Sequence, residues 1–146
     1  EIIADGAHLP SSLLKLIYKI KGPDKIALVT DSMRAAGMPE GESILGGIRD
    51  GQKVIVEDGV AKLPDRTAFA GSVATADRLV RTMINIAEVP LIDAVRMMTT
   101  TPAKIMKIDD RKGSIVVGKD ADLVIFDEDI NIQTTMVEGE VVYSRQ

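Results

Sequence analysis

The chain has 146 residues, of which 45% are hydrophobic, 27% charged and only 3% aromatic, so we expect about one globular domain with an aliphatic core. The net charge of −4 argues against a nucleic-acid partner, and no apolar run is long enough to predict a membrane span. Because the chain contains no cysteine, disulfides and thiolate metal sites are excluded, and we expect a cytoplasmic protein.

The first part of the chain predicts a strand, a helix and a second strand. Apolar residues 2–4 are typical of the end of a buried strand, and residues 5–8 follow as a loop. A helix begins after Pro10 and ends at Gly22. The run at 25–31 is short, apolar and bounded by turn residues, which predicts a second buried strand. This order and spacing favour a βαβ unit with parallel pairing and a right-handed crossover.

Asp31 stands at the carboxyl end of the second predicted strand. Parallel α/β folds place their chemistry at this end of their strands, so its carboxylate is a candidate catalytic group. The alternative is that Asp31 only caps the turn that follows. The strand by itself does not separate these two roles.

The middle of the chain predicts β structure between the second strand and a later helix. Residues 32–47 are rich in glycine and predict a loop. Asp-Gly turn signals at 50–51 and 58–59 flank a short strand at 53–56. We interpret residues 48–63 as an inserted β meander.

The last part of the chain predicts helices and then strands. The spacing of apolar residues predicts helices over 74–87 and after Pro90, and a further short helix with Thr101 as its N-cap and Pro102 in its first turn. Near Lys107 the pattern changes to that of strands. We expect these strands at residues 113–117, 121–126, 132–137 and 140–143, with a turn at 138–139.

His8 is the single histidine of the chain. A catalytic zinc site takes about three protein ligands, chiefly histidine and carboxylate, so the chain alone does not predict a conventional zinc site. A solitary histidine is more often a structural hydrogen-bonding group than a ligand. The place of His8 after a strand that ends in Asp-Gly nevertheless favours contact with a bound substrate.

Several stretches together resemble one family. They are, in chain order, residues 4–8 (Ala-Asp-Gly-Ala-His), 28–31 (Leu-Val-Thr-Asp), 46–47 (Gly-Gly), 70–72 (Ala-Gly-Ser), 96–97 with 101–103, and 113–115 with 118–124. The last of these is similar to the C-termini of many amidohydrolase-superfamily proteins. The Asp-Gly-x-His and Val-Thr-Asp pair, with the later Gly-Ser, selects the N-acetylglucosamine-6-phosphate deacetylases, and the chain resembles the C-terminal portion of that family.

The resemblance implies an α/β fold that is the C-terminal part of a (β/α)8 TIM barrel, plus part of a small β-sandwich domain. We therefore expect residues 1–106 to hold the last barrel strands and helices, with the β meander inserted at about 46–65. We expect residues 107–146 to form the C-terminal part of the small β domain.

The same resemblance implies a metal-dependent amide hydrolase that converts N-acetylglucosamine 6-phosphate to glucosamine 6-phosphate and acetate. The family's divalent metal, of the zinc or iron class, is held by a glutamate and two histidines that we expect upstream. No metal ligand is therefore assigned to this chain. Asp31 matches the catalytic aspartate, which would take a proton from the attacking water and return one to the leaving amine.

The resemblance also assigns residues to substrate binding. His8 matches a substrate-contacting histidine, and Asp5 either contacts substrate or caps its loop. Gly6 and Ala7 offer backbone groups to the same ligand. A second substrate-binding loop, at the start of the next helix, matches Phe69, Ala70, Gly71 and Ser72. Because a helix N-terminus favours the binding of anions, Ser72 could contact the substrate, but it is equally a candidate for the N-cap of the helix.

Two other hypotheses stay open. One is another amidohydrolase-superfamily enzyme, such as a deaminase or a dihydropyrimidinase-like enzyme, although the Asp-Gly-x-His and Ala-Gly-Ser stretches count against it. The other is a non-catalytic truncated module that binds phosphosugar or self-associates. The expected partners are a phosphorylated amino sugar and further copies of the chain, because a partial barrel exposes strand edges. We interpret Arg78 and Arg81 as solvated surface charges.

Overall fold

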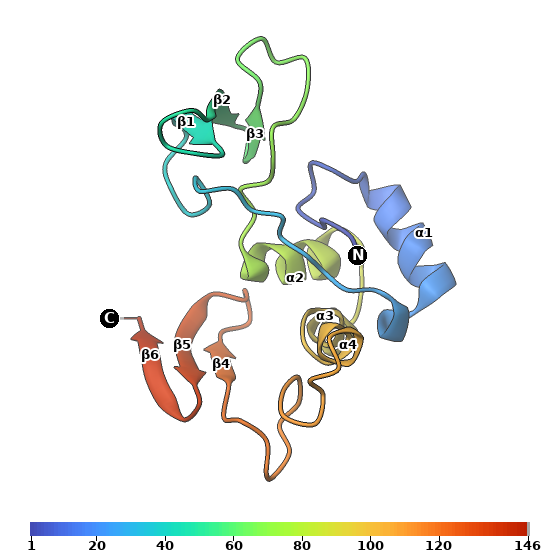
Figure 1. Cartoon of the computed structure of the whole chain (residues 1–146). Helices are drawn as coiled ribbons and strands as arrows, with labels where there is room; N and C mark the ends of the chain where they lie inside the picture. Colours follow the sequence, from blue (N-terminus) through green and yellow to red (C-terminus); the bar gives the residue numbers. More distant parts are fainter. Residues whose placement is uncertain (146) are drawn as a thin grey trace.

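The computed structural model describes residues 1–145 as a group of helices beside two separate three-stranded sheets (Figure 1). The helices are α1 (Ser11–Lys21), α2 (Ala76–Asn85), α3 (Leu91–Met98) and α4 (Thr100–Ile105), with a short 3-10 helix, η1 (Pro23–Lys25), after α1. The strands are β1 (Gly41–Leu45), β2 (Gln52–Glu57), β3 (Val60–Lys62), β4 (Leu123–Phe126), β5 (Ile132–Val137) and β6 (Glu140–Ser144). Both sheets are antiparallel, in the orders β1-β2-β3 and β4-β5-β6. Among residues 1–145, no helix has the length and hydropathy needed to cross a membrane.

The first two predicted strands pair in parallel, as expected, but over a very short length. Ile2 and Leu28 form a single parallel bridge, in which Ile2 N donates to Ala27 O and Val29 N donates to Ile2 O, each at 3.0 Å. Leu28 N turns the other way and donates to Met97 O, at the end of α3, at 3.0 Å. The strand predicted at 25–31 is therefore reduced to a bridge, because a helix end rather than a strand occupies its second edge.

The main core lies between this bridge and helices α1, α2 and α3. Leu79 and Met83, on the apolar stripe of α2, are fully buried, and Leu14 of α1 packs into the same cluster. These helices match the predicted periodicity, and their apolar faces stabilise them because burial of a Leu or Met side chain contributes about 1.5–3 kcal/mol. The fully or nearly buried members are Ala4, Leu14, Ile26, Leu28, Ala74, Leu79, Val80, Met83, Ala87, Val89, Ala94, Met97 and Ile130.

The inserted sheet, β1–β3, has a small core of its own. Val54, Val56, Ala61 and Ala70 are buried together, away from the main core. The prediction of a loop over 32–47 is wrong at its end, because Gly41–Leu45 is strand β1. That strand begins with exposed residues and is held by its pairing with β2, so its own sequence carries little strand signal.

The C-terminal sheet follows the predicted pattern closely. Strands β4, β5 and β6 correspond to the predicted strands at 121–126, 132–137 and 140–143, and the turn at 138–139 joins the last two. The strand predicted at 113–117 is wrong, since that segment pairs with no strand among residues 1–145. Its side chains Ile115 and Val117 are 89% and 103% exposed, so an apolar run here does not make a buried strand.

The last helix begins earlier than predicted. Helix α4 starts at Thr100, and Thr99 precedes it, so Thr101 is not the N-cap. Thr101 is instead buried, and its hydroxyl donates to Pro23 O at 2.8 Å. This bond ties α4 to η1, a role that depends on a residue 78 positions away.

Candidate functional site

Three loops that carry the predicted site residues meet at one edge of the main core. Ile2 and Leu28 are paired in parallel, and three residues beyond them the two segments reach Asp5 and Asp31. Because paired parallel segments leave a sheet at the same edge, the loop at 5–8 and the loop after Leu28 start side by side.

The third loop, residues 69–72, runs beside the segment at Asp31. Ser72 N donates to Asp31 O at 3.4 Å, and Met33 N donates to Ser72 O at 2.9 Å. Ser32 and Ser72 form a parallel bridge, and the Ser32 hydroxyl donates to Ala74 O. The predicted catalytic aspartate is thus held directly against the predicted substrate-binding loop by backbone contacts.

Asp31 is exposed and has a φ of 48°. A residue other than glycine in this left-handed region stores strain, of order 1 kcal/mol, and such strain is frequent at functional sites. Backbone bonds close the turn after Asp31, from Ala36 N to Met33 O at 3.1 Å and from Met38 N to Ala35 O at 3.0 Å.

Asp5 and His8 form a tightly bonded pair at the start of the first loop. One carboxylate oxygen of Asp5 accepts from the amides of Ala7 and His8, each at 2.9 Å, and the other lies 2.8 Å from His8 Nδ1. Burial of the carboxyl group raises the pKa of Asp5, but the hydrogen bonds from His8 and Ala7 outweigh it and bring the pKa below its ordinary value. An ionised Asp5 places the His8 proton on Nδ1, so Nε2 is the ring nitrogen left for a ligand.

The Asp5 side chain has no exposed surface, whereas that of His8 is 20% exposed. The carboxylate is therefore engaged within the protein and is closed off from direct contact with a ligand. Of the two roles left open for Asp5, the structure favours loop capping, together with the orientation of His8.

The loop at 69–72 contacts the first loop through an aromatic pair. The rings of His8 and Phe69 lie 5.1 Å apart, at an interplanar angle of 56°. Phe69 forms a bridge with Lys62, and Ala70 N donates to Ala61 O at 2.8 Å, so strand β3 holds this loop in place. The inserted sheet thereby supports one wall of the site.

Ser72 is fully buried, and its hydroxyl accepts a hydrogen bond from Ala74 N at 2.9 Å. Helix α2 begins only at Ala76, after Thr75, so the prediction that Ser72 could be its N-cap is wrong. The contribution of Ser72 to this site is made by its backbone, which binds the Asp31 segment. Gly71, with a φ of 99°, packs against Met33 and keeps the chain close to that segment.

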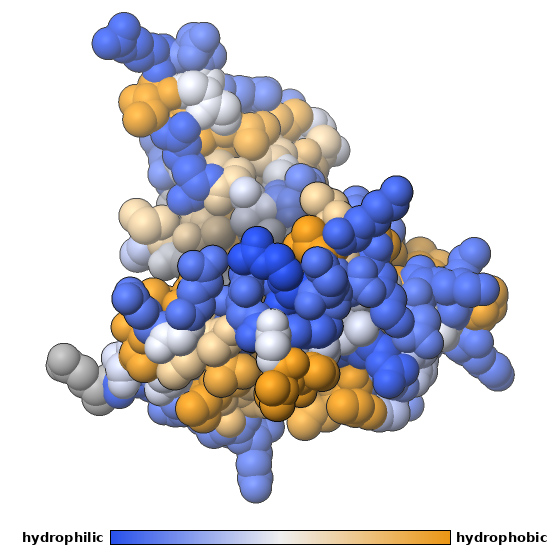
Figure 2. Space-filling model, turned by 60° about the horizontal axis from the view of Figure 1, so that its bottom comes forward, coloured by the Kyte–Doolittle hydropathy of each residue, from blue (hydrophilic) through white to orange (hydrophobic). Residues whose placement is uncertain are grey.

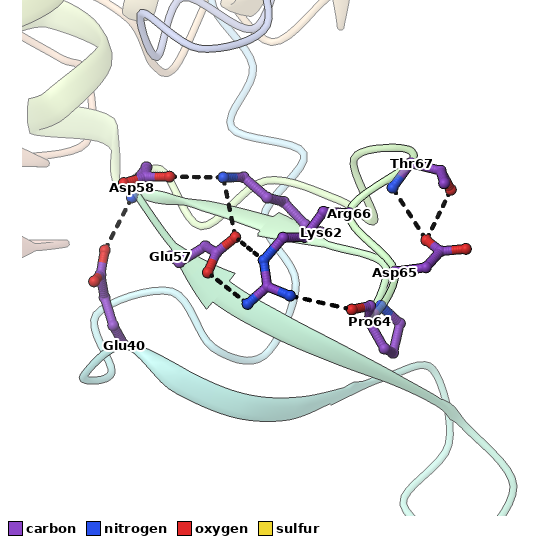
Figure 3. A network of polar contacts seen from close by, with 9 residues as sticks. Glu40, Glu57, Asp58, Lys62, Pro64, Asp65, Arg66 and Thr67 are labelled. Carbon is purple, nitrogen blue, oxygen red and sulfur yellow. Dashed lines mark hydrogen bonds and ion pairs between the residues drawn. The ribbon is translucent and has the colours of Figure 1, made fainter.

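Ion pairs brace the hairpin from which the Phe69 loop emerges (Figure 3). Lys62 Nζ lies 2.7 Å from Asp58 and 3.3 Å from Glu57, and Arg66 binds Glu57 through two nitrogens at 2.8 and 3.1 Å. These bonds, above all the one from Arg66, hold the pKa of Glu57 below its ordinary value. Because the two cations are matched by two carboxylates, this part of the site carries no net positive charge.

The resemblance to the deacetylases implies a divalent metal, for which His, Asp and Glu side chains are the possible ligands in this chain. Among residues 1–145, no three His, Asp or Glu side chains are grouped closely enough to hold a metal ion. His8 and Asp5 bind one another, and no further His, Asp or Glu side chain in the described part of the chain joins them to complete a group of three. The described part of the chain does not fit a metal site by itself.

The model of the amidohydrolase family matches residues 1–142. The chain belongs to the amidohydrolase family. Over 143 residues it is 38% identical to the N-acetylglucosamine-6-phosphate deacetylase of Bacillus subtilis (strain 168). The matched segment makes up 98% of this chain and 35% of the Bacillus protein.

Solved structures agree with this assignment. The N-acetylglucosamine-6-phosphate deacetylase from Pasteurella multocida matches 99% of this chain and 36% of its own, with 34% identity and a TM-score of 0.89. The enzyme of the same name from Thermotoga maritima matches 99% of this chain and 38% of its own, with 37% identity and a TM-score of 0.87. The resemblance stated from the motifs is confirmed, and the chain spans between a third and two fifths of the length of these amidohydrolases.

The sequence did not indicate that Arg78 contacts the site. Arg78 was interpreted as a solvated charge, but its side chain is half-buried and donates to Asp5 O and Gly59 O. Its partners lie 73 and 19 residues away, and nothing in the local sequence of α2 signals them. Arg81, which was interpreted in the same way, is also partly buried: it forms an ion pair with Asp77 at 2.9 Å and donates to two carbonyls of the β4–β5 loop.

Proposed function

We propose that this chain is the part of an N-acetylglucosamine-6-phosphate deacetylase that supplies the catalytic acid–base group and two substrate-binding loops. The observation that carries the proposal is the convergence of residues 5–8, 31–33 and 69–72 at one edge of the core. The names of the relatives supply the substrate and the reaction. The product pair would be glucosamine 6-phosphate and acetate.

In this proposal Asp31 is the general base and acid. Its exposed carboxylate accepts a proton from the water that attacks the amide carbonyl, and it returns a proton to the amine as the carbon–nitrogen bond breaks. The bond from Ser72 N to the carbonyl of Asp31 holds the backbone from which that carboxylate extends, and this supports the proposal. Fixed geometry matters because an acid–base group works only within hydrogen-bond reach of the proton that it moves.

Substrate contact is assigned to His8, through Nε2, to Phe69, and to the backbone groups of the two loops at Gly6, Ala7, Ala70 and Gly71. Asp5 acts by holding His8, and Ser72 acts by holding Asp31. This division follows the burial of the two side chains, since neither has surface available to a ligand.

We propose further that the divalent metal of this family, of the zinc or iron class, is bound by residues outside 1–145. The absence of a ligand group among the described residues supports this assignment. The metal would activate the attacking water when bound. We also propose the cytoplasm as the compartment, because the chain has no cysteine.

For the architecture, we propose that residues 1–106 belong to a (β/α)8 barrel that carries the β1–β3 insertion, and that 107–146 belong to a small β domain. The short parallel bridge and the helices around it support the first part, and the β4–β6 sheet supports the second. We also propose that further copies of the chain associate, because the edges of β4 and β6 are open in the described structure.

A chimera tests the function directly. In the Bacillus subtilis relative, the matching segment of 143 residues is replaced by this chain, and hydrolysis of N-acetylglucosamine 6-phosphate is measured. We expect an active enzyme in which Asp31→Asn lowers kcat by about 10²–10⁴-fold and leaves KM nearly unchanged. Asp110→Asn, at an exposed aspartate remote from the three loops in sequence, is the matched control and should keep full activity.

An active chimera in which Asp31→Asn keeps the activity of Asp110→Asn would refute the catalytic role of Asp31. The second candidate function is a module that binds phosphosugar without turnover, which the lack of a metal-ligand group among residues 1–145 favours for the chain on its own. Binding of N-acetylglucosamine 6-phosphate by this chain, together with a chimera that binds but does not hydrolyse, would support that candidate.

A further inference from the structure

Arg78 joins the two halves of the candidate site. Its Nε and Nη2 donate to Asp5 O at 3.2 and 2.8 Å, and its Nη1 donates to Gly59 O at 2.7 Å. Asp5 begins the loop that carries His8 and belongs to the edge of the main core. Gly59 lies in the turn between β2 and β3, in the inserted sheet that holds Phe69. One guanidinium thus binds both walls between which the His8–Phe69 contact is made.

We propose that Arg78 is a positioning residue that sets the distance between the His8 loop and the Phe69 loop. The inference deepens the proposed function, since it concerns the same substrate-binding surface. The inserted sheet and the helices have separate cores, so the inserted sheet needs a connection that fixes it relative to the main core. Arg78, on the first turn of α2, provides a rigid one.

The chemistry of the guanidinium suits this role. Its donors lie in one plane and point in fixed directions, so two carbonyls bound by it have a defined separation. A lysine in its place would offer a single flexible ammonium group, and it could not bind both carbonyls with the same geometry. The loss of Arg78 would also leave the partly buried carbonyl of Asp5 without its two donors.

Gly59 gives a second and independent indication. It has a φ of 69°, and a Cβ built on it would lie 3.0 Å from Nη1 and 3.1 Å from Nη2 of Arg78. Any side chain at Gly59 would therefore push against the guanidinium. Gly139, in the turn between β5 and β6, has a φ of 89°, but a Cβ built on it would have no neighbour within 4 Å. A substitution at Gly139 therefore causes similar backbone strain without a contact to the arginine.

The test uses this chain and its single histidine as the reporter. Because the chain has one histidine and two phenylalanines, a Phe126→Leu background leaves Phe69 as the single phenylalanine, and NMR contacts between the rings of His8 and Phe69 can then be assigned. In Arg78→Lys we expect the nuclear Overhauser contact between these rings to be lost while the resonances of the main core keep their positions. Arg81→Lys, on the next turn of the same helix, should keep the contact, because Arg81 binds the β4–β5 loop instead.

Gly59→Ala and Gly139→Ala form the second pair of variants. We expect Gly59→Ala to weaken the His8–Phe69 contact and Gly139→Ala to leave it unchanged. If Arg78→Lys unfolds the inserted sheet, the Gly59 pair decides the question, since it keeps the arginine. An unchanged ring contact in Arg78→Lys and in Gly59→Ala would overturn the proposal, and neither readout depends on catalytic activity or on the proposed substrate.

Discussion

The two three-stranded sheets of this protein share a topology but differ in what they bury. The inserted sheet β1–β3 buries Val54, Val56, Val60 and Ala61, whereas β4–β6 has no buried side chain in any of its strands. Both turn their last hairpin through a pair of positive-φ residues that ends in glycine. Local turn chemistry is therefore the same in both sheets, and the difference lies in the apolar surface that each sheet removes from water.

The surface of the second sheet remains apolar. A groove of about 930 Å3 lies between helices α2, α3 and α4 and the β4–β6 sheet, and apolar side chains such as Val95, Met98 and Phe126 line much of it. Figure 2 shows apolar surface gathered along the lower part of its view, interrupted by charged side chains. Exposed valines on β4 and β6 add to this surface. The comparison shows that the sheet beside the candidate site is stabilised by its own core, while the other sheet leaves its apolar surface open.

The largest expected effect separates the two sheets directly. Val54→Asp places a charge where the side chain is 1% exposed, and we expect it to lower the free energy of unfolding by about 3 kcal/mol or more. Val141→Asp, at 57% exposure on β6, should change it by about 0.5 kcal/mol or less. Denaturant unfolding of both variants measures the difference, and similar losses in the two would contradict the distinction between the sheets.

The next effect concerns the pair of Asp5 and His8, which faces the inserted sheet. Asp5→Asn keeps one acceptor oxygen but cannot accept from His8 Nδ1, so we expect a loss of about 1–3 kcal/mol at neutral pH. Nitrogen chemical shifts of the single histidine should also show that the proton leaves Nδ1. An unchanged tautomer would show that Asp5 does not orient the ring.

The pH dependence of stability should identify the same carboxylate. Because the pKa of Asp5 is lower in the folded chain than in the unfolded chain, its contribution is fully present above about pH 4 and is lost as the pH falls through the folded value. We expect the acid loss of stability to be smaller in Asp5→Asn than in the unmodified chain. Unfolding measured between neutral pH and about pH 3 gives both curves, and equal slopes would exclude this contribution.

The smallest expected effect is at Asp31. Asp31→Gly relieves a φ of 48° and should stabilise the fold by about 0.5 kcal/mol, although it removes the proposed catalytic group. Asp31→Ala keeps the unfavourable backbone and should give no such gain. If neither variant differs from the unmodified chain, the backbone at Asp31 stores no strain, and the structural argument for its function is weakened.

Features that depend on nearby residues were predicted from the sequence. The helices and the β5–β6 hairpin follow from apolar spacing and from turn residues, and the motifs at 4–8 and 28–31 correctly indicated the family. Features that depend on distant partners were not predicted. Strand β1 exists through its pairing with β2, and the apolar run at 113–117 has no strand to pair with among residues 1–145.

The candidate site shows the same limit. The positions of Asp31 and His8 at strand ends could be inferred from their neighbours in the chain. The long-range contacts of these residues come from Ser72 and Phe69, more than forty residues further along the chain. The role of Arg78 depends on partners in two other elements, so the sequence of α2 alone favoured a solvated charge.

The most direct test of the account is a titration of this chain with N-acetylglucosamine 6-phosphate, followed by NMR at His8 and Phe69. If the three loops form one substrate-binding surface, the ring resonances of both residues will shift together with a single dissociation constant. N-acetylglucosamine without the phosphate should bind more weakly at the same place. Shifts confined to the groove beside β4–β6, with His8 and Phe69 unchanged at saturation, would contradict the account.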